Sequence, residues 1–106
     1  MELSDEMLTE KALSYIKVAK PDFVFLYMVE TDEKGGHDNG WMSEEYLRSV
    51  RGTIGMVEDL VRALPEDFAV ILTADHGGHD RMHGTELAED MDIPVFVRTA
   101  DGAPLR

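Results

Sequence analysis

All four histidines of this chain fall within two polar, glycine-containing segments, residues 30–40 and 75–84. The same two segments also contain four aspartates, Asp32, Asp38, Asp75 and Asp80. Imidazole nitrogens and carboxylate oxygens together suit Zn or Mn, and Mg where the oxygens dominate. The chain has no cysteine, which excludes disulfides and thiolate ligands. The residue types therefore predict a divalent-metal site with His and carboxylate ligands.

The pair Asp75-His76 directly follows an apolar run, and this position favours two neighbouring ions. In a loop, adjacent side chains can diverge toward two ions, whereas a regular strand would point them to opposite faces. Two ions about 3.5–4 Å apart stabilise the attacking and leaving oxygens of an in-line displacement at phosphorus. The pattern thus indicates a reaction class, phosphoryl transfer, without indicating a substrate.

Two helices are predicted from capping residues, apolar periodicity and prolines. Ser4 can cap a first helix, whose apolar residues recur at helical spacing up to Pro21. Ser43 can cap a second helix, whose apolar stripe is stopped by Pro65. That stripe is interpreted as core.

Strands are predicted at residues 23–29, 68–74 and 94–97, with a short helical turn before the last. The first two, joined by a helix, make a βαβ unit with parallel strands and a right-handed crossover. Segments 30–40 and 75–84 would then leave the carboxyl ends of parallel strands, the edge where open α/β sheets bind ligands, and face each other. The expected fold class is α/β, with a mostly parallel sheet and helices on its faces.

Composition narrows the function classes. With 43% apolar and 30% charged residues, the 106-residue chain is expected to be one soluble globular domain over residues 1–106. The net charge of −12 argues against nucleic-acid binding. The longest apolar run, residues 23–29, is too short to span a membrane, and the N-terminus does not look like a signal peptide. A cytoplasmic location is the expectation.

Three segments resemble, in order, the motifs of the alkaline phosphatase superfamily, in the branch with nucleotide pyrophosphatases, type I phosphodiesterases and cofactor-independent phosphomutases. Residues 31–40 resemble its Asp-to-His metal loop, residues 73–78 its second signature, and residues 83–85 with 93–95 its third. The likeness covers roughly residues 22–97. It implies an incomplete alkaline-phosphatase-like core and a metal-dependent phosphoric ester hydrolase, of the phosphodiesterase, pyrophosphatase or phosphatase kind, or a phosphomutase.

The resemblance also implies two divalent ions, Zn or Mn, and a ligand set. The implied ligands are Asp32, His37 and His83 for one ion, and Asp75 and His76 for the other. Asp32 and His37 are five residues apart, whereas many relatives use a spacing of four. His79 has no counterpart and is interpreted, with Asp80, as loop surface or as a group behind the ligands. The alternative for Asp75, His76 and His83 is a solvated, glycine-rich surface loop, and for Asp32 and His37 it is a turn-forming aspartate and an isolated histidine.

In the resembled family, the second ion takes a further Asp and activates a Thr or Ser nucleophile, both upstream of the matched region. Here only residues 1–22 precede the first predicted strand, and Thr9 and Ser14 lie in the predicted helix. The chain is therefore expected to be a metal-binding half domain with an incomplete second site, no catalytic residue of its own and little turnover. Its expected partners are a phosphate ester in the intact domain and an upstream chain or a second copy. The alternatives are an assembly module that completes its sheet with a partner, without catalysis, and a fragment that binds nothing.

Overall fold

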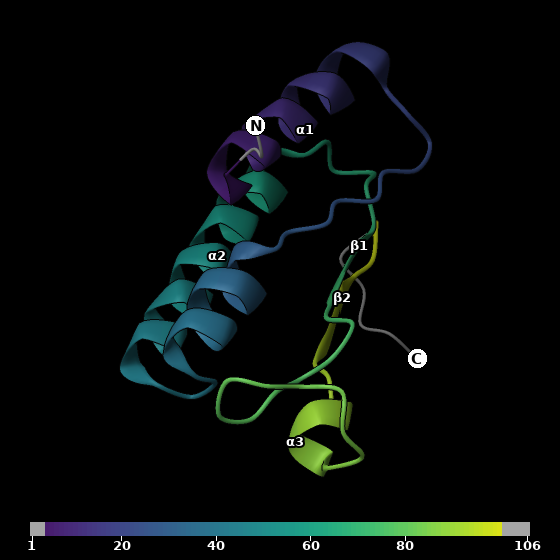
Figure 1. The fold of residues 1–106 in the computed structure, drawn as a ribbon. Helices are drawn as coiled ribbons and strands as arrows, with labels where there is room; N and C mark the ends of the chain where they lie inside the picture. The colour runs from purple at the N-terminus through teal and green to yellow at the C-terminus, as the bar shows by residue number, and fades with distance from the viewer. Residues whose placement is uncertain (1–3, 101–106) are drawn as a thin grey trace.

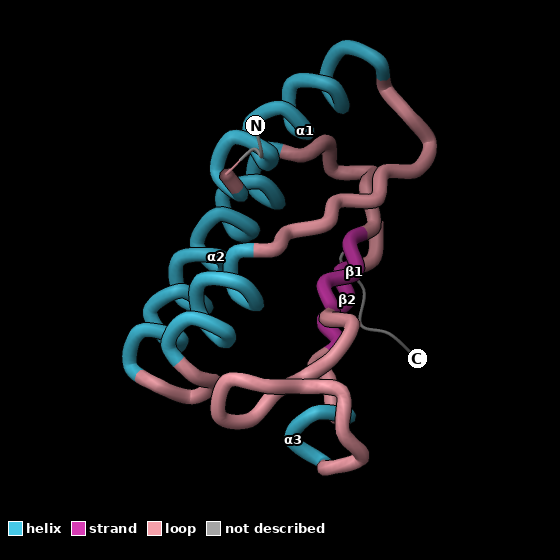
Figure 2. Tube along the Cα trace, in the orientation of Figure 1, coloured by secondary structure: helices cyan, strands magenta, loops and turns pink. Residues whose placement is uncertain are grey.

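The computed structural model of the protein describes residues 4–100 (Figure 1). In chain order the elements are α1 (Asp5–Ala19), the π-helix η1 (Thr31–His37), α2 (Glu44–Ala63), β1 (Val70–Thr73), α3 (Ala88–Met91) and β2 (Val95–Arg98). Helices α1 and α2 pack side by side, and η1 packs on α2. Figure 2 shows these helices on one side, with the two strands and long connecting segments on the other.

Both long helices form where capping residues and prolines predicted them. Ser4 and Ser43 are the N-caps of α1 and α2, and each hydroxyl accepts a hydrogen bond from the backbone N–H three residues later, at 3.2 and 3.1 Å. The helices end just before Pro21 and Pro65. Across residues 4–100, no helix combines the length and the apolar character needed to cross a bilayer.

The sheet differs from the predicted one. Strands β1 and β2 pair antiparallel, with Val70 opposite Arg98 and Thr73 opposite Val95. Residues 23–29, predicted to be a strand parallel to β1, form no ladder with it. Within residues 4–100 the fold is thus a mixture of helices and one two-stranded antiparallel sheet, and the predicted mostly parallel sheet is not formed.

Residues 23–29 nevertheless keep the alternation of a strand. Val24, Leu26 and Met28 are half-buried, whereas Phe23 and Phe25 are 81% and 77% exposed. The segment lacks a neighbouring strand, because residues 23–28 make no backbone hydrogen bond in the described part of the chain. A strand forms only when its backbone groups have a partner strand, which explains why the local pattern did not suffice.

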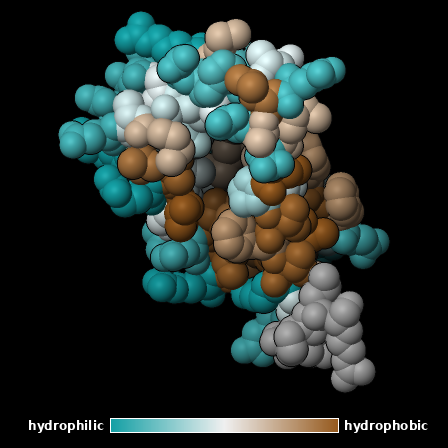
Figure 3. All heavy atoms as spheres, turned by 90° about the horizontal axis from the view of Figure 1, so that it is seen from below, coloured by the Kyte–Doolittle hydropathy of each residue, from teal (hydrophilic) through white to brown (hydrophobic). Residues whose placement is uncertain are grey.

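Much apolar surface stays exposed as a result. Among the described residues, Ile16 is the one hydrophobic side chain that is fully buried. Figure 3 shows apolar side chains gathered on the face seen from below. The large exposed apolar side chains of the strands and the extended segment include Phe23, Phe25, Tyr27, Ile71, Val95 and Phe96. Patches of this extent mark an interaction surface on a folded protein.

A buried carboxylate joins α1 to the segment that enters η1. Asp5 is 1% exposed, and its two oxygens accept hydrogen bonds from the backbone N–H groups of Val29 (3.1 Å) and Glu30 (3.0 Å). The N–H of Asp5 in turn donates to Oε1 of Glu30 at 3.0 Å. These bonds satisfy the buried charge and hold the start of η1 on the first turn of α1.

Candidate metal centre

The segment predicted as a loop at residues 30–40 is instead helical, and its π-helical turn explains the spacing of two candidate ligands. The N–H of Asp38 donates to the carbonyl of Glu33, five residues earlier. In an α-helix, residues five apart lie about 140° apart around the axis. The wider π-turn brings them to nearly the same face. Accordingly, Nε2 of His37 lies 3.4 Å from Oδ2 of Asp32.

Trp41 separates the two histidine-containing segments and requires glycine on both. A Cβ atom built on Gly36 would lie 2.4 Å from the indole ring, and one built on Gly78 would lie 2.2 Å from it. The ring centroid of Trp41 lies 5.1 Å from that of His37 and 5.7 Å from that of His83. The indole is therefore a wall of the candidate site, packed between η1 and the segment after β1.

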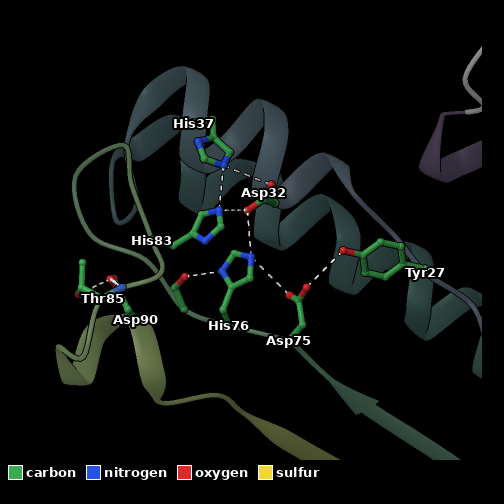
Figure 4. Close-up of polar contacts among 9 residues, drawn as sticks. Tyr27, Asp32, His37, Asp75, His76, His83, Thr85 and Asp90 are labelled. Carbon is green, nitrogen blue, oxygen red and sulfur yellow. Dashed lines mark hydrogen bonds and ion pairs between the residues drawn. The ribbon is translucent and has the colours of Figure 1, made fainter.

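Three side chains from the two segments converge on one point (Figure 4). One ligand atom from each of Asp32, His76 and His83 lies within 4.8 Å of the others. Oδ1 of Asp32 is 3.4 Å from Nε2 of His76 and 3.7 Å from Nε2 of His83. The imidazole rings of His76 and His83 stack, with centroids 3.8 Å apart. Segments 30–40 and 75–84 therefore meet, as predicted.

The hydrogen bonds around His76 show that this group fits a cation. Nδ1 of His76 lies 2.6 Å from the carbonyl oxygen of Gly77, which can only accept, so Nδ1 has the proton. In the neutral ring, Nε2 then has a lone pair facing Oδ1 of Asp32. That carboxylate oxygen is buried and has no hydrogen-bond partner. Two facing lone pairs repel each other, whereas a divalent ion between them would bind both.

His37 flanks the three-residue group on the side of η1. Its Nε2 lies 3.2 Å from Nε2 of His83, and its side chain is 42% exposed. The resemblance grouped His37 with Asp32 and His83, and the structure places all three in mutual contact. It also adds His76 to them, a residue that the resemblance assigned to the other ion.

Asp75 flanks the group on the opposite side and points outward. Its side chain is 60% exposed, with Oδ1 3.5 Å from Nε2 of His76. Its Oδ2 accepts a hydrogen bond from the Tyr27 hydroxyl at 3.2 Å, and the negative charge of Asp75 raises the pKa of Tyr27. Tyr27, at the end of the extended segment, thereby orients the carboxylate that follows β1.

A hydrogen-bonded cluster joins the ligand segment, residues 75–85 with His76 and His83, to Asp90 in α3. Nδ1 of His79 lies 2.6 Å from Oδ1 of Asp90, and Oδ2 of Asp90 accepts from the N–H and hydroxyl of Thr85, at 2.9 and 2.5 Å. Asp90 is 3% exposed. Desolvation raises its pKa, but the hydrogen bonds from Thr85 and His79 outweigh this and lower it to about 2. The hydrogen bond to Asp90 raises the pKa of His79.

In this cluster His79 contacts Asp90, and it is not part of the group formed by the candidate ligands Asp32, His76 and His83. Asp90 was not identified from the sequence. The signal available was weak, since a carboxylate in a four-residue helix of an acidic chain is usually a solvated charge. Only the position of α3 against the ligand segment makes it a buried acceptor.

Comparisons with known proteins agree with the chemistry of the site. The family model described as the metalloenzyme superfamily matches residues 1–101. The phosphopentomutase of Deinococcus radiodurans is 33% identical over 76 residues, 72% of this chain and 19% of that protein. The phosphopentomutases of Desulfitobacterium hafniense and Clostridium kluyveri are 27% and 28% identical over 88 residues, 83% of this chain and 22% of theirs. The chain thus spans about one-fifth of the length of these relatives. No solved structure matches it.

Proposed function

Since the chain belongs to the metalloenzyme superfamily, we propose that it is the metal-binding part of a phosphoryl-transfer centre for phosphate esters. The observation that carries this proposal is the buried Oδ1 of Asp32, which has no hydrogen-bond partner and lies 3.4 Å from Nε2 of His76 and 3.7 Å from Nε2 of His83. Carboxylate and imidazole ligands favour Zn or Mn at this position.

Each residue near the site would have a defined task. Asp32, His76 and His83 would hold one ion, which would polarise a phosphoryl oxygen as a Lewis acid. His37 and Asp75 lie on either side of the group. Under the proposal, Asp75 contributes to a second ion whose remaining ligands come from another polypeptide segment.

The nucleophile would come from that other segment too. The hydroxyl of Thr9 donates to the carbonyl of Glu6 at 2.8 Å, and Thr9 is 7% exposed within α1. Ser14 also lies in α1. Neither hydroxyl is presented on a sharp strand-to-helix turn of the kind that exposes a nucleophile. The names of the relatives favour transfer of a phosphoryl group within a pentose phosphate over hydrolysis of a diester.

A second candidate function, assembly with another polypeptide, is favoured by the extended segment at residues 23–29. Its backbone groups are unpaired at residues 23–28, and Phe23 and Phe25 are exposed beside it. An added strand would pair with this backbone and cover these rings. Segments 23–29 and β1 would then belong to the mostly parallel sheet that the sequence pattern predicts. The added strand would come from an upstream polypeptide or from a second copy.

Light scattering separates these two sources. A dimer whose mass reverts to that of a monomer on Phe25→Lys substitution would support a second copy. A strict monomer at all concentrations would exclude self-assembly and remove this support for the assembly role.

The proposed phosphoryl-transfer role is tested with inorganic phosphate as the probe. Paramagnetic Mn²⁺ bound to the chain should broaden the ³¹P resonance of phosphate more than an equal concentration of free Mn²⁺ does in the absence of protein. Asp32→Asn should abolish this excess broadening. Asp38→Asn, which removes the same charge from an exposed residue of the same segment, should retain it. Mn²⁺ binding without excess broadening would instead indicate a metal-binding module, and no Mn²⁺ binding would refute the proposed site.

A further inference from the structure

The carboxylate of Asp90 fastens the ligand segment to α3 at two points. Each oxygen of Asp90 binds a different part of the segment: Oδ1 binds Nδ1 of His79, and Oδ2 binds the N–H and the hydroxyl of Thr85. His79 is three residues after His76, and Thr85 is two residues after His83. The carboxylate therefore contacts the segment next to both candidate histidine ligands.

The backbone strengthens this attachment. The N–H of Gly77 donates to the carbonyl of Asp90, and the N–H of Gly78 donates to that of Glu89, both at 2.8 Å. A Cβ on Gly77 would lie 2.0 Å from the carbonyl oxygen of Glu89, so only glycine allows this approach. His79 and Met82 exchange two backbone hydrogen bonds across the turn between them.

Without such an attachment the segment would not hold a defined shape. It contains Asp80 with φ 49° and Gly84 with φ 94°, in the left-handed region, and it belongs to no long helix or strand. A loop of this kind samples many conformations unless side-chain hydrogen bonds restrict it. The buried carboxylate of Asp90 accepts three such hydrogen bonds, one from His79 and two from Thr85.

We propose that Asp90 is a positioning residue of the metal centre, which holds the segment so that His76 and His83 present Nε2 to one ion. The inference rests on the proposed function. Asp90 itself does not touch the ion. It acts by raising the fraction of molecules whose two histidines are already in the binding geometry, and apparent affinity scales with that fraction.

The test compares Mn²⁺ affinity, measured by calorimetry on the full chain, in four variants. Asp90→Asn is expected to weaken binding about 10-fold or more, in the range known for groups behind metal ligands. Asp92→Asn is the matched control, because it removes the same charge from an exposed residue two positions further on. His79→Ala should weaken binding, whereas His79→Asn, whose amide N–H takes the place of Nδ1–H, should restore much of it.

Hydrogen exchange of the metal-free chain provides an independent readout. In the unaltered chain the hydrogen-bonded amides of this segment, those of Gly77, Gly78, His79, Met82 and Thr85, should be protected, and Asp90→Asn should remove this protection while α1 and α2 keep theirs. If Asp90→Asn also exposes α2, the His79→Ala and His79→Asn pair decides the question instead. Equal Mn²⁺ affinity in Asp90→Asn and Asp92→Asn, in a chain that binds Mn²⁺, would overturn the positioning role alone. Absence of Mn²⁺ binding by the unaltered chain would overturn the metal centre and the positioning role together.

Discussion

Nε2 of His76 and Oδ1 of Asp32 face each other at 3.4 Å, although both are acceptors when the imidazole is neutral. Such a contact is unfavourable in the absence of a cation, because neither atom offers a proton to the other. The pair is therefore arranged for binding rather than for the stability of the metal-free chain.

This arrangement predicts an unusual response to Asp32→Asn. Without metal, the substitution should leave the free energy of unfolding unchanged or increase it, because an amide N–H can donate to Nε2 of His76. Saturating Mn²⁺ or Zn²⁺ should stabilise the unaltered chain by about 2.7 kcal/mol at 100 times the Kd, and the variant by far less. Urea unfolding with and without metal measures both effects. A variant that loses stability without metal and still responds to metal would contradict the arrangement.

The packing of the Trp41 indole against Gly36 and Gly78 predicts that Gly→Ala substitutions there lower the stability of the chain, whereas a Gly→Ala substitution elsewhere in a helix raises it. Gly36→Ala and Gly78→Ala would each drive a methyl group into the indole ring and should cost about 1–3 kcal/mol of unfolding free energy. Gly52→Ala is the control, since Gly52 lies within α2 with open space around it. It should stabilise the chain by about 0.5–1 kcal/mol. Urea unfolding of the three variants decides, and a similar effect in all three would show that the indole does not pack as described.

The contact between His79 and Asp90 predicts a pH dependence. The pKa of His79 is raised, so its contribution to stability is complete below about pH 6.5 and lost as pH rises through the folded-state pKa. Asp90, with a pKa of about 2, contributes above about pH 3.9, and its contribution is lost as pH falls through about 2. NMR titration should show a raised pKa for His79, and Asp90→Asn should lower this pKa. A His79 pKa that is not raised, or that Asp90→Asn leaves unchanged, would contradict the contact.

Exposed and half-buried side chains alternate along residues 23–29, so substitutions at neighbouring positions should change the stability of the chain by different amounts. Phe25→Ser should change the stability of the chain by no more than about 0.5 kcal/mol, because Phe25 is 77% exposed. Leu26→Ser, at a half-buried position, should destabilise it by about 1 kcal/mol or more. Thermal unfolding of the two variants measures the contrast, and a larger loss for Phe25→Ser would mean that the segment has the opposite face inward.

What was predictable from the sequence depends on how local the cause is. Ser4 and Ser43 each cap the first turn of the helix that follows them, and Pro21 and Pro65 each end the helix that precedes them. Because these effects are local, both helices were predicted correctly. The position of Asp75-His76 after β1 was predictable for the same reason, because a short apolar run defines the end of a strand. The two histidine-containing segments meet as predicted, but the parallel sheet from which that meeting was predicted is not formed within residues 4–100.

The remainder depended on contacts that the local pattern of residue types does not encode. Strand formation at residues 23–29 needs a partner strand, and the local apolar pattern does not supply one. The π-turn of η1 has no sequence signature, yet it resolves the five-residue spacing of Asp32 and His37. Asp90 is eleven residues from His79 along the chain, and its carboxylate becomes buried only when α3 packs against the ligand segment.

The most direct test of the metal centre is metal content. The chain is loaded with Zn²⁺ or Mn²⁺, freed of unbound ions by gel filtration and analysed for metal per protein. We expect about one retained ion per chain, since three protein ligands make one site. Asp32→Asn and His83→Ala should lose this ion, and Asp38→Asn should retain it. No retained metal in the unaltered chain, or equal retention in all four proteins, would contradict the proposed metal centre.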